Sequence, residues 1–131
     1  MVSALQHTDK PQCEKVNITI FAADHGIAAE GVSAFPQSVT GQMVQNFASG
    51  GAAISVLAKS LNASLDVINL GTVEPLAPIK GVEDQRIAAG TANFSVKSAM
   101  TEEQLQKALS IGQRSIKKAI DDGAQLWIGG E

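Results

Sequence analysis

The sequence predicts an α/β protein in which helices flank an open parallel sheet. Short apolar runs suit strands buried on both faces, segments with helical spacing lie between them, and glycines mark where the runs end. The 131 residues are the length of one ordinary domain. Apolar residues make up 44% and charged residues 18%, and the net charge is −3, which excludes a disordered acidic tail and a basic nucleic-acid arm.

The first strand is predicted at Val16–Ala23, a β-branched apolar run that stops at Asp24-His25-Gly26. Residues 1–16 are polar and aperiodic and are interpreted as a lead-in segment. Residues 17–131 are interpreted as the N-terminal part of the α/β domain. A loop rich in glycine and proline follows the strand as far as Gln37.

A two-part helix is predicted next, because apolar positions recur at helical spacing over residues 39–47 and 54–61 with Gly50-Gly51 between them. We expect the helix to stop at Asn62 and a second strand to occupy residues 65–70. Strand, helix and strand form a crossover unit, which is right-handed in nearly all parallel sheets.

Residues 72–99 are interpreted as a long connection with short strands around residues 85–88 and 94–96. A capping box of Thr101 and Gln104 then predicts the start of a helix. Its positively charged residues, Lys118 among them, are expected to face water. Its single apolar stripe is expected to contain Leu105, Ala108, Leu109, Gly112, Ile116, Ala119 and Ile120.

Gly123 is predicted to cap this helix, and residues 124–128 form a third strand that leads to Gly129-Gly130-Glu131. An open parallel sheet needs helices on both faces, and two helical units cover only part of it. The expected fold is therefore a Rossmann-like three-layer sheet that is incomplete in this chain. The alternative is a complete small domain whose last strand lies at a protected edge.

The carboxyl ends of the strands are the expected binding edge, because ligands of open α/β sheets bind there. This edge would bring together Asp24 and His25, Asn69 and Glu131. A purely structural interpretation is also open, in which Asp24 caps a turn through its side chain. Neighbouring residues on a strand point to opposite sides, so Asp24 and His25 are not expected to form a catalytic dyad.

Several other classes are disfavoured. The glycine-containing stretch 49–53 lacks both the dinucleotide fingerprint and the lysine of a phosphate loop. The favoured interpretation is that its small residues allow close helix packing, and a dinucleotide-dependent oxidoreductase is disfavoured. Cys13 and two histidines are too few for a zinc site, and a single cysteine suits the reducing cytoplasm. No signal peptide, membrane span or basic stripe with aromatic residues is present, so neither membrane nor nucleic acid is an expected partner.

The stretch Phe21-Ala22-Ala23-Asp24-His25-Gly26 and the closing Gly129-Gly130-Glu131 resemble motifs of the nicotinate-nucleotide–dimethylbenzimidazole phosphoribosyltransferases. Between them, residues 30–37, 39–40, 42–47, 50–54, 86–94 and 99–101 resemble further stretches of that family in the same order. The resemblance covers about residues 17–131. It implies transfer of the phosphoribosyl group of nicotinate mononucleotide to 5,6-dimethylbenzimidazole, giving α-ribazole 5′-phosphate and nicotinate for cobalamin biosynthesis.

The resemblance also implies a parallel-sheet domain, a smaller helical domain built from both chain ends, a homodimer and no cofactor or metal. It assigns Phe35 and Met43 to the benzimidazole pocket, and Glu131 to the glutamate that meets the nucleotide ribose. Asp24 matches an acid at a strand end and is expected to shape the site. The family's catalytic base is a glutamate beyond Glu131, so no catalytic residue is expected in this chain, and the chain alone is expected to be inactive. The alternative is a non-catalytic nucleotide- or azole-binding α/β domain.

Overall fold

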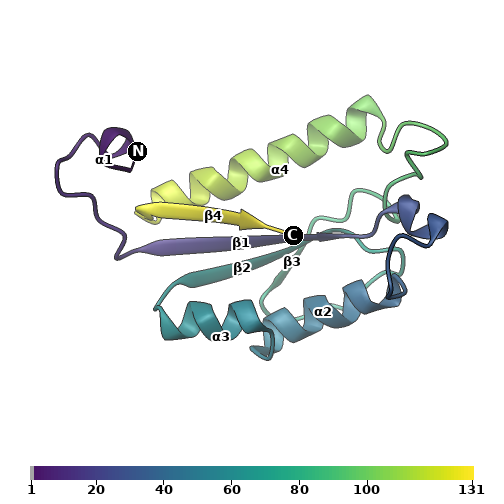
Figure 1. The fold of residues 1–131 in the computed structure, drawn as a ribbon, viewed down its shortest axis with the longest axis horizontal. Helices are drawn as coiled ribbons and strands as arrows, with labels where there is room; N and C mark the ends of the chain where they lie inside the picture. Colours follow the sequence, from purple (N-terminus) through teal and green to yellow (C-terminus); the bar gives the residue numbers. More distant parts are fainter. Residues whose placement is uncertain (1) are drawn as a thin grey trace.

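A four-stranded parallel sheet lies between two layers of helices in the computed structural model, which describes residues 2–131 (Figure 1). The order across the sheet is β3-β2-β1-β4. The strands are β1 (Val16–Ala23), β2 (Ser64–Gly71), β3 (Val82–Asp84) and β4 (Leu126–Gly130). The predicted α/β class and the three predicted strands are therefore confirmed.

The two-part helix is also confirmed, as α2 (Ser38–Ser49) and α3 (Ala53–Ser60) on one face of the sheet (Figure 1). Gly50 ends α2 in the left-handed conformation with a φ of 86°, which a residue without a Cβ adopts without strain. The longest helix, α4 (Glu102–Asp121), covers the opposite face (Figure 1). The helices thus form the outer two of three layers.

The two faces of β1 carry different side chains, which explains how one strand serves both layers. Ile18, Ile20 and Ala22 are buried and belong to the apolar clusters beneath α2 and α3. The alternate residues Asn17 and Thr19 are equally buried but polar. Because side chains alternate along a strand, the polar residues lie on the face that α4 covers. This face therefore needs internal hydrogen bonds.

The lead-in segment contains one helical turn, α1 (Val2–Leu5), and residue 1 of the prediction lies outside the described residues. Glutamine side chains hold the segment to the start of β4. The Gln6 amide donates to the carbonyl oxygens of Gln12 at 2.8 Å and Gln125 at 3.1 Å. The Gln125 side-chain oxygen accepts from the backbone N–H of Glu14 at 2.8 Å. The lead-in therefore lies at the amino edge of the sheet.

The predicted short strands in the long connection are wrong in position. The only strand described between residues 72 and 99 is β3, which ends before the predicted 85–88 strand begins. Gln85 and Ile87 still donate backbone hydrogen bonds to β2, at 2.9 and 2.7 Å, so the chain stays extended beyond the ladder. Residues 94–96 form a turn instead, because oxygen atoms of Asn93 accept from the backbone N–H groups of residues 95, 96 and 97.

The start of α4 agrees with the prediction. The Thr101 hydroxyl accepts from the Gln104 backbone N–H at 3.2 Å, and the Gln104 side chain accepts from the Thr101 N–H at 2.9 Å. These two bonds form a complete capping box, which satisfies donors at the helix start. Gly123 follows α4 with a φ of 78°, as expected of a glycine cap.

The single apolar stripe predicted for α4 is wrong. Ile111, which lay outside the prediction, and Ala119 are the buried residues of the helix. Leu109, Ile116 and Ile120 remain 52%, 39% and 65% exposed. The apolar surface of α4 is wider than its contact with the sheet, so much of it has no partner among residues 2–131.

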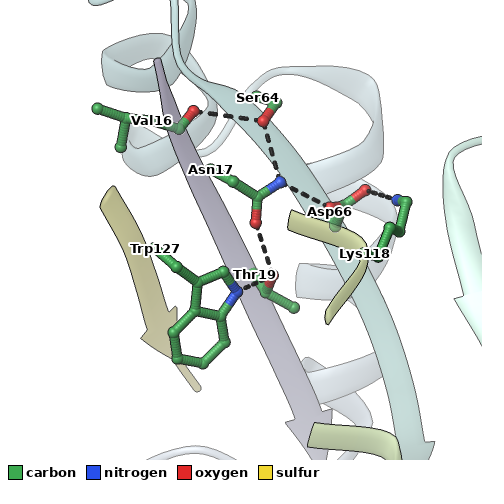
Figure 2. Close-up of polar contacts among 7 residues, drawn as sticks. All are labelled: Val16, Asn17, Thr19, Ser64, Asp66, Lys118 and Trp127. Atoms are coloured by element: carbon green, nitrogen blue, oxygen red, sulfur yellow. Dashed lines mark hydrogen bonds and ion pairs between the residues drawn. The ribbon is translucent and has the colours of Figure 1, made fainter. Parts of the chain in front are cut away.

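A chain of polar side chains joins β1, β2 and α4 (Figure 2). The Asn17 amide donates to the Ser64 hydroxyl at 3.0 Å and to the Asp66 carboxylate at 2.9 Å. Lys118, which was expected to face water, reaches the other Asp66 oxygen at 2.8 Å. The Thr19 hydroxyl donates to the Asn17 side-chain oxygen at 3.1 Å. These bonds satisfy the polar face of β1.

The ion pair shifts the pKa values of both Asp66 and Lys118. Burial raises the pKa of the Asp66 carboxyl, but the hydrogen bonds from Lys118 and Asn17 outweigh that effect and hold the pKa below its usual 3.8. The hydrogen bond to Asp66 raises the pKa of Lys118 above its usual 10.5, against a smaller opposing effect of burial. Each charged form is therefore stabilised by folding.

Lys118→Met is expected to lower the free energy of unfolding near neutral pH by less than about 1 kcal/mol, because the lysine is more than half exposed and the pair is screened. A lowered carboxyl pKa stabilises the fold above the unfolded value of 3.8 and loses its effect as pH falls through the folded pKa. A raised lysine pKa stabilises the fold below 10.5 and loses its effect as pH rises through the folded pKa.

Urea unfolding of wild type and Lys118→Met across pH measures this contribution. The two proteins are expected to differ in their free energy of unfolding at pH values between 3.8 and 10.5. This difference is expected to shrink in acid, below the folded pKa of Asp66. A difference that persists undiminished in acid would mean that lost packing of the lysine stem, and not the ion pair, causes the destabilisation.

Candidate functional site

A cavity of about 980 Å³ lies at the carboxyl ends of the strands. It opens beside the ends of β1 and β4. The chain leaves β1 toward β2 on one side, while β4 joins β1 on the other, so the strand order reverses between β1 and β4. Ligands of open α/β sheets bind at such a reversal. The position of the cavity thus agrees with the edge predicted from the sequence.

The four residues assigned to substrate binding all line this cavity. Asn69, which was also expected at this edge, does not line it, because its side chain is fully buried and donates to Thr72 and Asp84. Asp24 lies just after β1, Phe35 lies in the loop before α2, Met43 lies on α2, and Glu131 follows β4. Segments that are separated by up to about a hundred residues therefore meet at one site.

Asp24 is 4% exposed and connects the loops around the cavity. Its carboxylate accepts the Val73 backbone N–H at 2.7 Å, just beyond the end of β2. Its backbone donates to the Gly71 carbonyl and accepts from the Thr91 N–H, both at 3.0 Å. The turn-capping interpretation of the sequence therefore describes what the Asp24 carboxylate does here. Asp24 holds two loops against the end of β1.

His25 also lines the cavity but, unlike Asp24, is exposed. Its backbone carbonyl accepts the Gln37 side-chain amide at 3.1 Å. That bond draws the start of α2 toward the end of β1. Because the Asp24 carboxylate is directed to Val73 instead, it does not orient the His25 side chain, and both residues lie just beyond the end of β1.

The loop that carries Phe35 is fixed at its base and open at its tip. At the base lies η1 (Gly26–Glu30), a short 3-10 helix. The Glu30 carboxylate accepts from the Asn93 amide at 2.5 Å and the Ser95 hydroxyl at 3.2 Å. At the tip, Phe35 is 71% exposed although its ring borders the cavity. The ring is thus available to a ligand.

The wall formed by α2 was only partly predicted. Val39, Met43 and Phe47 all line the cavity, and their spacing of four residues places them on one side of the helix. Of these three, only Met43 was assigned to the site from the sequence. The same i, i+4 spacing would have identified the other two once Met43 was chosen. These three side chains form an apolar surface, which suits a flat aromatic ring, and the polar Thr40 of α2 also lines the cavity.

Two acidic residues, Asp24 and Glu131, also line the cavity. Glu131 is exposed, and it follows Gly130, which pairs with Ile20 of β1. A free carboxylate beside an apolar wall can accept hydrogen bonds from hydroxyl groups of a bound ligand. Among residues 2–131, no three side chains of His, Cys, Asp or Glu gather closely enough to hold a metal ion.

The strand order, the helices on both faces and the cavity at the reversal define a doubly wound α/β protein with a ligand site at its carboxyl edge. A family profile described as phosphoribosyltransferase matches residues 1–131. The chain belongs to this family, whose curated members are named nicotinate-nucleotide–dimethylbenzimidazole phosphoribosyltransferase. The match includes the lead-in segment, which the resemblance seen in the sequence did not cover.

Three individual proteins illustrate the similarity. The chain is 54% identical over 130 residues to the enzyme of that name from Pseudomonas putida W619, and 57% identical to that from Pseudomonas fluorescens SBW25. It is similar to the crystal structure of CobT from Thermus thermophilus, with a TM-score of 0.88 and 40% identity over 98% of this chain.

The similarity covers only part of each relative. The chain spans 37% of the two Pseudomonas enzymes and 40% of the Thermus structure, and 99% of its own length matches the former. Separately, none of the helices described between residues 2 and 131 combines the length and apolar character needed to cross a membrane.

Asp24→Ala is expected to lower the free energy of unfolding by about 1–3 kcal/mol, because the Val73 N–H loses its acceptor in a buried setting. Asp24→Asn retains a side-chain oxygen and is expected to cost less. Urea unfolding of both variants measures the difference. Asp121→Ala, which removes an exposed acid at the end of α4, is the control and should change stability by under about 0.5 kcal/mol. Equal stability of Asp24→Ala and wild type would contradict the bracing role.

Proposed function

We propose that this chain is part of a longer enzyme that transfers the phosphoribosyl group of nicotinate mononucleotide to 5,6-dimethylbenzimidazole. The products are α-ribazole 5′-phosphate and nicotinate, and the reaction serves cobalamin biosynthesis. The observation that carries the proposal is the match of the whole chain to relatives named for these substrates at 54–57% identity. A cavity with an apolar wall and a carboxylate, at the strand-order reversal, supports it.

The chemistry is a displacement at the anomeric carbon of the ribose. A ring nitrogen of the benzimidazole forms a bond to that carbon as the bond to the nicotinate nitrogen breaks, and the bonding electron pair leaves with nicotinate. The benzimidazole then carries a proton that a base must remove. By the family resemblance that base is a glutamate of the longer enzyme beyond Glu131. Positive charge develops on the ribose in the transition state, where a carboxylate stabilises it.

We assign Glu131 to this ribose. Glu131 is exposed, lines the cavity and follows β4, beside which the strand order reverses. No hydrogen bond to its carboxylate is described within residues 2–131. Its oxygens are thus free to accept from ribose hydroxyls. Asp24 shapes the site from behind, since its carboxylate is already occupied by Val73.

We assign Phe35 and Met43 to the benzimidazole. Met43 belongs to the apolar wall of α2, and a thioether adapts its shape to an aromatic ring. Phe35, in the loop before α2, also lines the cavity and is exposed. Stacking against a planar base would bury its ring.

The resemblance supports three further proposals about the longer enzyme. We propose that it is a homodimer and that residues 17–131 form the N-terminal part of its α/β domain, with residues 1–16 leading in. We propose a cytoplasmic location, which suits the exposed free thiol of Cys13. Substrates are the two small molecules named above.

The longer protein is expected to release nicotinate and form α-ribazole 5′-phosphate from nicotinate mononucleotide and dimethylbenzimidazole, as chromatography of both products would show. The 131-residue chain alone is expected to be inactive, because it lacks the base and the remainder of the enclosing structure. Binding of both ligands by the longer protein without turnover would instead favour a non-catalytic binding domain. Turnover by the short chain would contradict the placement of the base.

Phe35→Ala in the longer protein is expected to weaken binding of dimethylbenzimidazole about tenfold, because a lost stacking partner costs about 1–3 kcal/mol. Binding of the mononucleotide should change far less. Phe94→Ala is the matched control, since Phe94 is a phenylalanine of similar exposure, 64% against 71%, that lies outside the cavity. Calorimetry with each ligand measures both affinities. Equal losses for the two ligands would place Phe35 outside the base pocket.

A further inference from the structure

The end of β4 has almost no side chains to hold it in place. Glu131 is preceded by Gly129 and Gly130, and glycine weakens a strand because it packs nothing and is flexible when unfolded. Strand register is weakly specified in such glycine-rich segments. The carboxylate assigned to the ribose therefore depends on an anchor elsewhere in β4.

Trp127, which lies in β4, anchors this strand to its neighbour β1. Its indole N–H donates to the Thr19 hydroxyl at 3.0 Å (Figure 2). Thr19 pairs with Gly129, not with Trp127, so the indole reaches two residues forward along the strand pair. The ring continues toward Phe21, with 6.4 Å between the two ring centroids and 58° between their planes. Trp127 thus spans the stretch of β1 that faces the end of β4.

The two glycines are the residues that this arrangement requires. A Cβ atom on Gly129 would lie 2.6 Å from an indole carbon of Trp127, so the ring occupies the space where a side chain would stand. On the other face, a Cβ atom on Gly130 would lie 3.2 Å from the side chain of Ile20. Trp127 can therefore pack here only because the residues that follow it are glycines, and the same glycines leave the end of β4 without side chains to hold it.

The acceptor of this hydrogen bond is itself fixed. Thr19 is 1% exposed, and its hydroxyl hydrogen is directed to Asn17, which leaves the oxygen lone pairs for the indole. Asn17 is held in turn by Ser64 and Asp66 of β2 (Figure 2). The Trp127 N–H thus meets an oriented acceptor that belongs to the central strands.

A change of register would remove Glu131 from the cavity. A shift of β4 by one residue would move the indole to the other face of the sheet, away from Thr19. A shift by two residues would keep the face but displace Glu131 by roughly 6–7 Å along the strand. Either shift breaks the hydrogen bond of Trp127 to Thr19, so that bond selects the register in which Glu131 borders the cavity.

We propose that Trp127 is a positioning residue for phosphoribosyl transfer, because its hydrogen bond to Thr19 fixes the register of β4 and so holds Glu131 beside the ribose. The inference rests on the proposed function for its catalytic consequence. Its structural part, the immobilisation of residues 129–131, stands on the contacts alone. The two parts are therefore tested by separate measurements.

The structural part is tested by amide hydrogen exchange in the longer protein. Trp127→Phe removes the N–H donor while keeping an aromatic ring, and it is expected to speed exchange at Gly130 and Glu131 at least fivefold. Lys118→Met is the matched control, because it breaks the distant end of the same network and leaves the Trp127 bond intact. It should leave exchange at these two amides nearly unchanged. Equal protection in Trp127→Phe and wild type would overturn the inference whatever the enzyme's activity.

The catalytic part is tested by a double-mutant cycle with Glu131→Gln, by measuring kcat and KM for phosphoribosyl transfer. Glu131→Gln is expected to lower kcat at least tenfold, and Trp127→Phe about fivefold with KM for dimethylbenzimidazole within a factor of two. Because Trp127 acts through Glu131, the double variant should be no slower than Glu131→Gln alone. Lys118→Met should keep wild-type kcat.

Each other outcome has a distinct meaning. The same fivefold loss in both backgrounds would overturn the positioning role, since Trp127 would then act independently of Glu131. Wild-type kcat in Glu131→Gln would overturn the role assigned to Glu131, and the catalytic part of the inference with it. Absence of turnover in the wild-type longer protein would refute the proposed function while the exchange measurement still decides the structural part. Thr19→Val removes the same bond from β1 and should repeat the exchange result if Trp127→Phe folds poorly.

Discussion

The pairing of β1 with parallel neighbours on both sides is the interaction on which the rest of the structure depends. β2 and β4 both pair with β1, and β3 joins through β2. One face of β1 packs against α2 and α3 through Ile18 and Ile20, and the other carries the buried Asn17 and Thr19. The last residues of β1, from Ile20 to Ala23, line the cavity. Core, polar network and site thus share one strand.

Patterns within a single segment predicted the fold well. The apolar run of β1, the glycine break between α2 and α3, and the capping box of α4 each depend on residues close in sequence, and each is confirmed. Features that depend on distant partners were missed. β3 exists because it lies against β2, and Ile111 is buried because of how α4 rests on the sheet. Neither contact leaves a periodic signal in its own segment.

For the candidate site, too, some features were predicted from the sequence and others were missed. The rule that ligands bind at the carboxyl edge selected the edge at which the cavity lies. Of the residues it pointed to, Asp24, His25 and Glu131 line the cavity, whereas Asn69 is buried away from it. The polar network behind the site was not predicted, since an asparagine and a threonine inside an apolar run look like ordinary strand residues. Only the fold brings them to Trp127, more than a hundred residues away. Long-range hydrogen bonds of this kind have no sequence signature.

The long connection after β2 helps to make the rim of the cavity rigid, which gives its length a physical reason. It crosses the end of β1 so closely that a Cβ atom on Gly26 would lie 2.5 Å from the backbone of Asn93, and one on Gly90 would lie 2.9 Å from that of Asp24. Only glycine permits such approaches. Asp24 then joins the crossing chains through hydrogen bonds to Val73 and Thr91. The carboxyl edge is therefore braced from behind, so that the loop tip with Phe35 and the end of β4 can face a ligand from a fixed base.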